Sequence, residues 1–195
     1  MSPRTKEQFQ DMREERKQQI MEAALEVFAE NGYHKSSISQ IAKEANISKG
    51  LMYNYFQNKE DLLIGVMDDG VQYLLRAYIE ATGEPAKVQL RNMIVNSFDF
   101  MDKDYKHWRL YFSTMMQSDV QQIVMPKILE SAMPVFQNLA RLFRELGYKD
   151  SYQEARLFAA ALDGLGMNYL MDAENFPKDY CVQRLLEIYH LNENK

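Results

Sequence analysis

Apolar residues recur at intervals of three and four through almost the whole chain, which is the spacing of one buried stripe along an α-helix. Leu62, Leu63 and Val66 begin one such stripe. Only 5 Pro and 8 Gly occur among 195 residues, so few positions interrupt a long helix. No stretch shows the alternation of apolar and polar residues that is typical of a half-buried strand. The pattern predicts an all-α protein of about nine helices.

Capping signals indicate where the first helices begin and end. Ser37 and Gln40 have the spacing of a capping box at the start of the second helix. Asn46 tolerates the left-handed turn that would end this helix, and Ser48 and Asn58 are suitable N-caps for the next two helices. Together with the periodicity, these signals predict helices over residues 13–31, 37–44, 48–56, 59–81, 86–102, 104–117, 121–146, 152–172 and 178–191.

The composition is that of a soluble globular protein, with 46% hydrophobic and 26% charged residues. Cys181 is the one cysteine, so no intrachain disulfide can form, which fits a reducing compartment. The polar N-terminus has no apolar core of a signal peptide, and no uncharged run approaches the roughly 18–20 residues that span a bilayer. We therefore expect a cytoplasmic protein without a membrane anchor.

The charges are distributed unevenly. The net charge is −5, yet residues 31–59 contain four lysines and a single acidic residue, Glu44. Such a basic patch on an acidic body is either a local phosphate-binding surface or a solvated lysine face. Charge alone does not choose between these two interpretations.

Two short helices joined by a tight turn after a supporting helix form the helix-turn-helix arrangement, whose last helix enters the major groove of DNA. Met52 and Phe56 are four residues apart and would face the core, so Lys49, Gly50, Tyr53 and Asn54 would face outward. Gly50 has no side chain and lets the backbone approach DNA closely. Lys49 supplies charge, and the Tyr53 or Tyr55 phenol can donate to a phosphate. Lys59, at the start of the next helix, is also placed to bind a phosphate.

The stretch from Ile20 to Leu63 resembles the N-terminal domain of the TetR family of transcriptional regulators. The resemblance rests on the pieces "AA..VF...GY", "IA..A", "SKG..Y.YF" and "KE.L", which occur in order at the family's spacing. Asn46 stands where the family usually has glycine. Leu51 is either a contact to a thymine methyl group or a neighbour of the core. The resemblance implies DNA contacts along the following residues: Ser37, Ser39, Ser48, Lys49, Gly50, Leu51, Tyr53, Tyr55 and Lys59.

The polar N-terminal segment contains Arg4, Lys6, Arg13, Arg16 and Lys17, but four acidic residues nearly balance these charges. It either trails along DNA or is a frayed, solvated tail, and we expect the tail. The expected domains are residues 1–60, the arm and DNA-binding domain, and residues 61–195, an effector and dimerisation domain.

The resemblance also implies a homodimer on a near-palindromic site, paired through the last two long helices. Small residues keep the helix over 152–172 thin, and the last helix has apolar surface beyond a narrow stripe. These residues either form the dimer interface, which we expect, or pack on the chain's own core. The expected interface residues are Ala159, Ala160, Gly164, Leu185 and Tyr189.

The middle helices are rich in Met and aromatic residues, which form either a plain core or the wall of a largely apolar effector cavity. The family mechanism implies that a small, largely apolar molecule shifts the fourth helix and releases the DNA. The candidate cavity residues are Phe98, Met101, Trp108, Tyr111, Phe112, Met115, Met133 and Phe136.

The sequence offers no set of residues for catalysis or metal binding. His34, His107 and His190 are scattered, and Asp104 with His107 supplies only two ligands. We therefore expect no catalytic residues, no metal and no cofactor. The preferred function is a ligand-responsive repressor that binds double-stranded DNA. An activator, a nucleoid-associated protein and an all-α ligand-binding protein remain alternatives.

Overall fold

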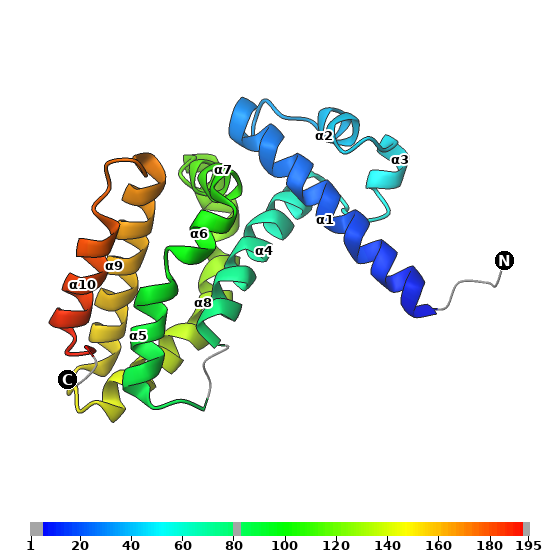
Figure 1. Ribbon diagram of the computed structural model, residues 1–195. Helices are drawn as coiled ribbons and strands as arrows, with labels where there is room; N and C mark the ends of the chain where they lie inside the picture. The colour runs from blue at the N-terminus through cyan, green and yellow to red at the C-terminus, as the bar shows by residue number, and fades with distance from the viewer. Residues whose placement is uncertain (1–5, 80–82, 193–195) are drawn as a thin grey trace. The chain divides into compact units, whose positions relative to one another are not determined.

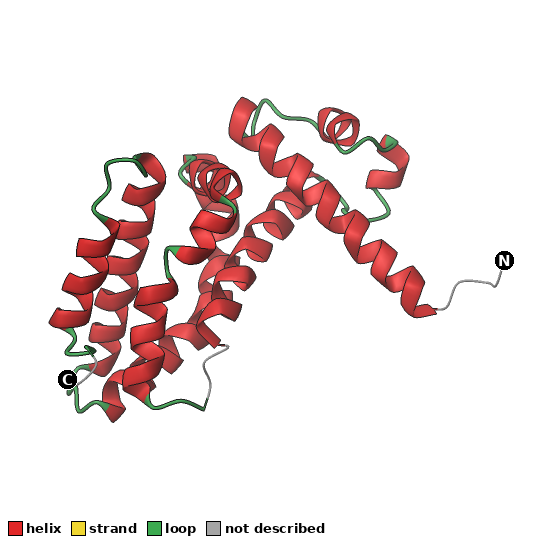
Figure 2. Ribbon diagram, in the orientation of Figure 1, coloured by secondary structure: helices red, strands yellow, loops and turns green. Residues whose placement is uncertain are grey.

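The structure is a computed structural model that describes residues 6–79 and 83–192, with side chains described except at 73–79 and 100. Arg4 and the predicted helix end near Ala81 lie outside the described residues. All ten elements in the described ranges are α-helices, which confirms the all-α class (Figures 1 and 2). The helices are α1 (Lys6–Asn31), α2 (Ile38–Glu44), α3 (Lys49–Met52), α4 (Lys59–Ile79), α5 (Ala86–Asn96), α6 (Asp99–Lys103), α7 (Tyr105–Met115), α8 (Ser118–Glu145), α9 (Ser151–Met171) and α10 (Lys178–Ile188).

The predicted and observed helices differ most in three places. Helix α1 begins at Lys6, so the described part of the N-terminal segment is a helix and not a frayed tail. Helix α3 ends at Met52, because the amides of Asn54 and Tyr55 donate to carbonyls three residues back and form turns. The helix predicted over 86–102 is divided into α5 and α6 at Ser97, whose hydroxyl donates to the Ile94 carbonyl (2.7 Å).

The chain forms two compact units. One contains the residues up to Gly70 together with Leu110–Ile128, and the other contains Val71–Arg109 and the residues from Leu129 onward. Helices α4, α7 and α8 contribute residues to both units. The proposed domain boundary after residue 60 stays a prediction.

The first unit has a core around the C-terminal half of α1. Ile20, Phe28, Ile41, Met52 and other side chains from α1 to α4 have no exposed surface. Burying each such side chain stabilises the fold by about 1.5–3 kcal/mol relative to leaving it in water. This core fixes α2 and α3 against α1, so their remaining faces are left to solvent.

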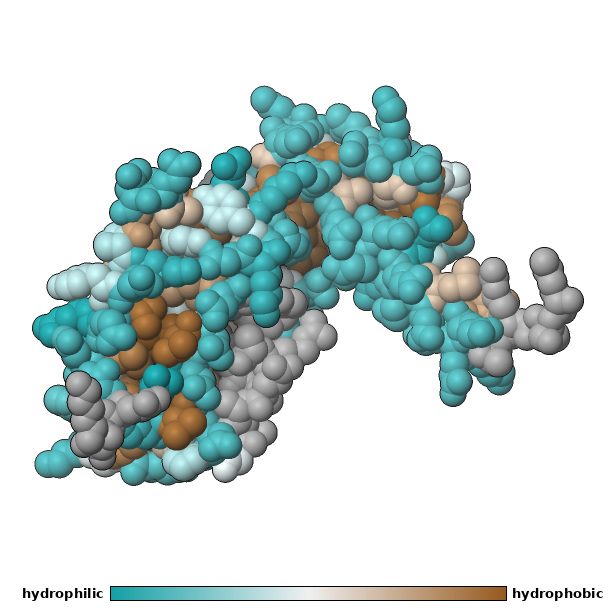
Figure 3. Space-filling model, viewed as in Figure 1, coloured by the Kyte–Doolittle hydropathy of each residue, from teal (hydrophilic) through white to brown (hydrophobic). Residues whose placement is uncertain are grey.

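The second unit has a core that α5, α8, α9 and α10 supply. Phe143, Phe158 and Tyr189 lie with ring centroids 5.2–5.5 Å apart, in tilted and edge-to-face pairs. Burial raises the pKa of Tyr189 to about 12, together with the charge of Glu154 and a hydrogen bond to it. On the face that Figure 3 shows, hydrophilic residues cover most of the surface, and hydrophobic surface gathers over α5 and α10.

Candidate nucleic-acid interface

The turn between α2 and α3 is built from local hydrogen bonds. Ser37 accepts the Gln40 amide, while the Gln40 side chain accepts the Ser37 amide (2.8 Å), so the predicted capping box is present. At the other end of α2, Asn46 has a φ of 52°, the left-handed conformation that the sequence predicts. The amide of Ile47 reaches back to the Ala42 carbonyl (2.9 Å), which closes a Schellman motif. These bonds fix the angle at which α3 leaves the turn.

Helix α3 is held by two buried side chains and one cap. Met52 has no exposed surface and Phe56 is 4% exposed, as the sequence predicts. The Ser48 Oγ accepts the Leu51 amide (3.1 Å) and begins the helix. With Met52 and Phe56 facing inward, Lys49 of α3 and Tyr53 at its C-cap are left exposed to solvent.

The structure leaves most of the predicted DNA-contacting residues accessible. Leu51 and Tyr55 are half-buried, so both interpretations of Leu51 remain open. Lys35, Lys43 and Gln40 are exposed as well and were not among the predicted contacts, although the lysines belong to the basic patch. The exposed members of the predicted set are Ser37, Ser39, Ser48, Lys49, Gly50, Tyr53 and Asn54.

The three serines differ in the donors that they can offer a phosphate. The Ser37 hydroxyl lies 2.9 Å from Gln40 Oε1, an acceptor, so the single proton of that hydroxyl is used inside the capping box. The Ser48 hydroxyl accepts a bond from Leu51 and keeps its own proton for another partner. Ser39 is exposed on α2. Ser37 is therefore better described as a capping residue than as a phosphate donor.

Lys59 has an internal role that the sequence did not indicate. Its ammonium group donates to the carbonyls of Tyr33 (2.8 Å), Ser36 (2.9 Å) and His34 (3.3 Å). It also lies 4.3 Å from the centroid of the Tyr33 ring. A lysine has three N–H donors, and all three have acceptors here. Lys59 therefore connects α4 to the α1–α2 loop, and its contact with a phosphate stays a prediction.

The segment between α7 and α8 holds the same loop. The Gln117 side chain accepts the Tyr33 amide (2.9 Å) and donates to the Phe28 carbonyl (3.1 Å). His34 Nε2 lies 3.3 Å from a carboxylate oxygen of Asp119. These residues are more than eighty positions apart in the chain, so no local sequence signal could have found the contact.

The predicted effector residues do not gather in one described groove. Phe98, Met101 and Trp108 are buried in the second unit, where Phe98 packs on Tyr169 with ring centroids 5.3 Å apart. Tyr111 is buried in the first unit, and its hydroxyl donates to the Met67 carbonyl (3.1 Å). Phe112 and Met115, also in the first unit, are half-buried, whereas Met133 of the second unit is 45% exposed. Phe136 is half-buried in the second unit, and the centroid of its ring lies 4.5 Å from Cζ of Arg156.

The predicted dimer residues separate into two groups. Ala160 and Gly164 are exposed on α9 and Ala159 is half-buried, so they remain candidates. Leu185 and Tyr189 belong to the core of their own chain, which leaves them little surface for a partner, and their place at the interface stays a prediction. The exposed large apolar side chains of the last two helices are instead Tyr152, Leu157, Met171, Tyr180 and Ile188.

Within the described ranges, no helix is long and apolar enough to cross a membrane. The described His, Cys, Asp and Glu residues form no group of three that could hold a metal ion. Lys178 and the Tyr169 hydroxyl both donate to Asp102, and this cluster ties α6 to α9 and α10. The bond to Asp102 raises the pKa of Tyr169 to about 12, together with burial.

Known proteins share both the sequence pattern and the fold. Residues 20–66 match the sequence profile of the family described as "Bacterial regulatory proteins, tetR family". The chain is 40% identical over 89 residues to the "Fatty acid metabolism regulator protein" of Bacillus subtilis, which covers 45% of this chain and 46% of that protein. It is 31% identical over 122 residues to the "HTH-type transcriptional activator FasR" of Mycolicibacterium smegmatis, and this match covers 62% of this chain and 56% of that protein. The chain thus spans about half the length of these two relatives.

A solved structure resembles the chain over nearly its whole length. The transcriptional regulator FadR from Bacillus subtilis, in complex with stearoyl-CoA, superposes with a TM-score of 0.69 and 27% sequence identity. The superposition covers 88% of this chain and 96% of that one.

Proposed function

Because the chain belongs to the TetR family of bacterial regulatory proteins, we propose that it is a dimeric, ligand-responsive repressor whose α2–α3 surface binds a near-palindromic operator. The relatives are transcriptional regulators and not enzymes, and we assign this chain no catalytic role. As a DNA-binding regulator, the protein would act in the cytoplasm, where bacterial DNA is located.

The environment of Gly50 is the observation that most strongly supports a DNA-binding surface on α3. A Cβ added at this position would meet no atom closer than Ser48 Oγ, at 4.0 Å. The φ angle of Gly50 is not in the left-handed range, so neither packing nor backbone conformation within the chain requires a glycine there. An outside surface that must approach the backbone closely, such as the edge of a base pair or a phosphate, does require one. Lys49 and Tyr53, close to Gly50 in the chain, add a positive charge and a phenol that can bind phosphates.

The proposed dimer would use the exposed apolar face of α9 and α10. Leu157 and Gly164 are seven residues apart and Met171 follows after seven more, so they lie near one side of α9. Leu157 is 60% and Met171 74% exposed, which is unfavourable for a side chain left in water. Tyr180 and Ile188 add exposed apolar area on α10. A two-fold pairing of this surface would give one molecule with two copies of α3, which is the number that a near-palindromic site requires.

For the effector we propose a long-chain acyl thioester. The support is the likeness to FadR, which binds stearoyl-CoA in its solved complex, and to the fatty acid metabolism regulator. An acyl chain needs a largely apolar wall, and Met and aromatic side chains between residues 98 and 136 could supply it. The candidate wall residues stay the predicted set: Phe98, Met101, Trp108, Tyr111, Phe112, Met115, Met133 and Phe136.

We propose that the ligand releases the protein from DNA by shifting α4. Lys59, the first residue of α4, bonds three carbonyls of the α1–α2 loop, and Gln117 holds the same loop from the α7–α8 segment. A ligand that favours a shifted α4 would therefore also move the helices that carry Lys49. The shift in DNA affinity can equal only the difference in the ligand's affinity for the two arrangements.

The test is a selection of genomic fragments by the purified protein, followed by titration of the selected duplex. We expect submicromolar binding of a near-palindromic fragment, loss of binding with stearoyl-CoA, and no loss with coenzyme A alone. A reporter gene under the selected fragment should be silenced; activation would favour the mode of the FasR relative. Retention of stearoyl-CoA without binding to any fragment would favour a ligand-binding protein instead.

A further inference from the structure

The N-terminal half of α1 extends beyond the core of its unit. No residue of α1 before Ile20 is buried, so residues 6–19 form about 21 Å of helix that contributes nothing to the core. In Figure 1 these turns project away from α2 and α3. The extension is nevertheless tied to the candidate interface, because Arg13 donates to the Asn54 carbonyl (3.3 Å) and its guanidinium lies 5.5 Å from the Tyr55 ring.

The helix separates charges that cancel in the sequence. Residues 6–17 contain four basic and four acidic side chains. Lys6 is seven residues before Arg13, and Arg16 and Lys17 are three and four residues after it, so the basic side chains share one face. Glu7, Asp11, Glu14 and Glu15 follow the same spacing on the opposite face.

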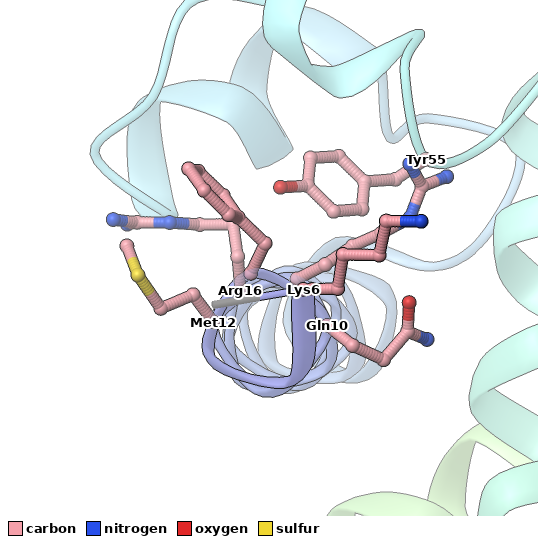
Figure 4. Close-up of a pocket in the computed structure, with 7 residues that line it drawn as sticks. Lys6, Gln10, Met12, Arg16 and Tyr55 are labelled. Atoms are coloured by element: carbon pink, nitrogen blue, oxygen red, sulfur yellow. The ribbon is translucent and has the colours of Figure 1, made fainter. Parts of the chain in front are cut away.

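The basic face borders an open groove beside the α3–α4 turn. The groove has a volume of about 650 Å³, and its lining includes three cationic side chains, Lys6, Arg13 and Arg16, together with Phe9, Gln10, Met12 and Tyr55. Figure 4 looks along α1 and shows Lys6 and Arg16 extending on the side of the helix that Tyr55 overlies. The acidic residues of the opposite face do not line it. The groove thus places three cationic side chains, and no acidic one, beside the segment that follows α3.

We propose that this basic face of α1 is a second DNA-binding element, which holds the phosphate backbone beside the bases that α3 contacts. Its charge is complementary to phosphates, and its connection to Asn54 and Tyr55 makes it continuous with the interface proposed above, on which this inference rests. Lys6 and Arg16 supply the phosphate contacts, and Arg13 positions the helix by bonding Asn54. The four acidic residues face away from the duplex.

The test compares Lys6→Gln/Arg16→Gln with the parent on the selected duplex, in a long form and in a form trimmed to the half-sites. The matched control is Lys103→Gln/Lys149→Gln, which removes the same charge from exposed lysines of the second unit. Circular dichroism checks that helix content is unchanged. We expect the double variant to bind the long duplex on the order of tenfold more weakly, with a salt slope reduced by about two for each subunit. Trimming should weaken the parent and the control but not the variant.

The inference is overturned if the parent binds and the double variant matches it in affinity, salt slope and response to trimming. An equal loss in the control would overturn it too, because the effect would then come from net charge. If the parent binds no duplex, the proposed function and this inference both fail.

Discussion

Gly70, inside α4, offers a quantitative test of the packing in the first unit. A Cβ at this position would lie 2.7 Å from Tyr111 Cδ2 and 2.9 Å from Cζ, and closer still to Cε2. Carbon atoms normally pack at about 3.5–4.0 Å, so the ring would have to move by roughly 1 Å or more. Tyr111 is 2% exposed and its hydroxyl is bonded to the Met67 carbonyl, so the ring has little freedom to do so.

The expected result for Gly70→Ala follows from three opposing contributions. Overpacking costs about 1–3 kcal/mol, and strain on the Tyr111 hydrogen bond costs a further 0.5–1.5 kcal/mol or so. The better helix propensity of alanine returns about 1 kcal/mol. We expect a net loss of about 1–3 kcal/mol in the free energy of unfolding, measured by urea denaturation.

Gly164 provides the matched control in another helix. A Cβ there meets no atom of its own chain within 4 Å, so Gly164→Ala should stabilise the subunit by about 0.5–1 kcal/mol through helix propensity, measured at a protein concentration at which the proposed dimer has dissociated. Adding Tyr111→Leu to Gly70→Ala should make the combined loss smaller than the sum of the two single losses. If Gly70→Ala is as stable as Gly164→Ala, the described packing of Tyr111 on α4 is wrong.

Three further predictions concern the ties between helices and the exposed glycine. Gln117→Ala should lower the free energy of unfolding by about 1–3 kcal/mol, because two backbone groups lose their partner, and urea denaturation measures this loss. Burial would raise the pKa of Asp102, but the hydrogen bonds from Lys178 and Tyr169 lower this pKa overall. The ionised Asp102 therefore stabilises the fold above its unfolded pKa of 3.8, and this stabilisation disappears as the pH falls below that value. Asp102→Asn should therefore reduce the loss of stability between pH 7 and pH 3, measured by thermal unfolding. Gly50→Ala should leave stability unchanged or raise it by up to about 1 kcal/mol, yet weaken DNA binding in an anisotropy titration.

Local features of the fold could be predicted because their causes lie within a few residues. The capping box of Ser37 and Gln40 and the left-handed Asn46 depend only on side chains and torsion angles at those positions. Asn58 likewise accepts the amide of Asp61 (2.8 Å) as an N-cap. The inward position of Met52 follows from the same helical periodicity that reveals the all-α class.

The remaining features depend on partners that are distant in sequence. Lys59 was expected at a phosphate because it begins a helix, yet carbonyls more than twenty residues away occupy its donors. Leu185 and Tyr189 were expected at the dimer surface because their helix has apolar residues on more than one stripe. Which stripe the core covers is decided by the packing of α10 on α5 and its neighbours. The balanced charges of the N-terminal segment suggested a solvated tail, and only the helix shows that they lie on opposite faces.

In the proposed complex, the exposed side of α3 enters duplex DNA. This placement is tested most directly by comparing Lys49→Ala/Tyr53→Ala with Lys149→Ala/Tyr152→Ala, a pair of the same residue types in the second unit with Tyr53 49% and Tyr152 45% exposed. Binding of the selected duplex is measured by fluorescence anisotropy over a series of salt concentrations. We expect at least about tenfold weaker binding for the α3 variant, a salt slope lower by about one for each subunit, and parent-like binding for the other pair. Parent-like affinity and salt slope in the folded α3 variant would contradict it.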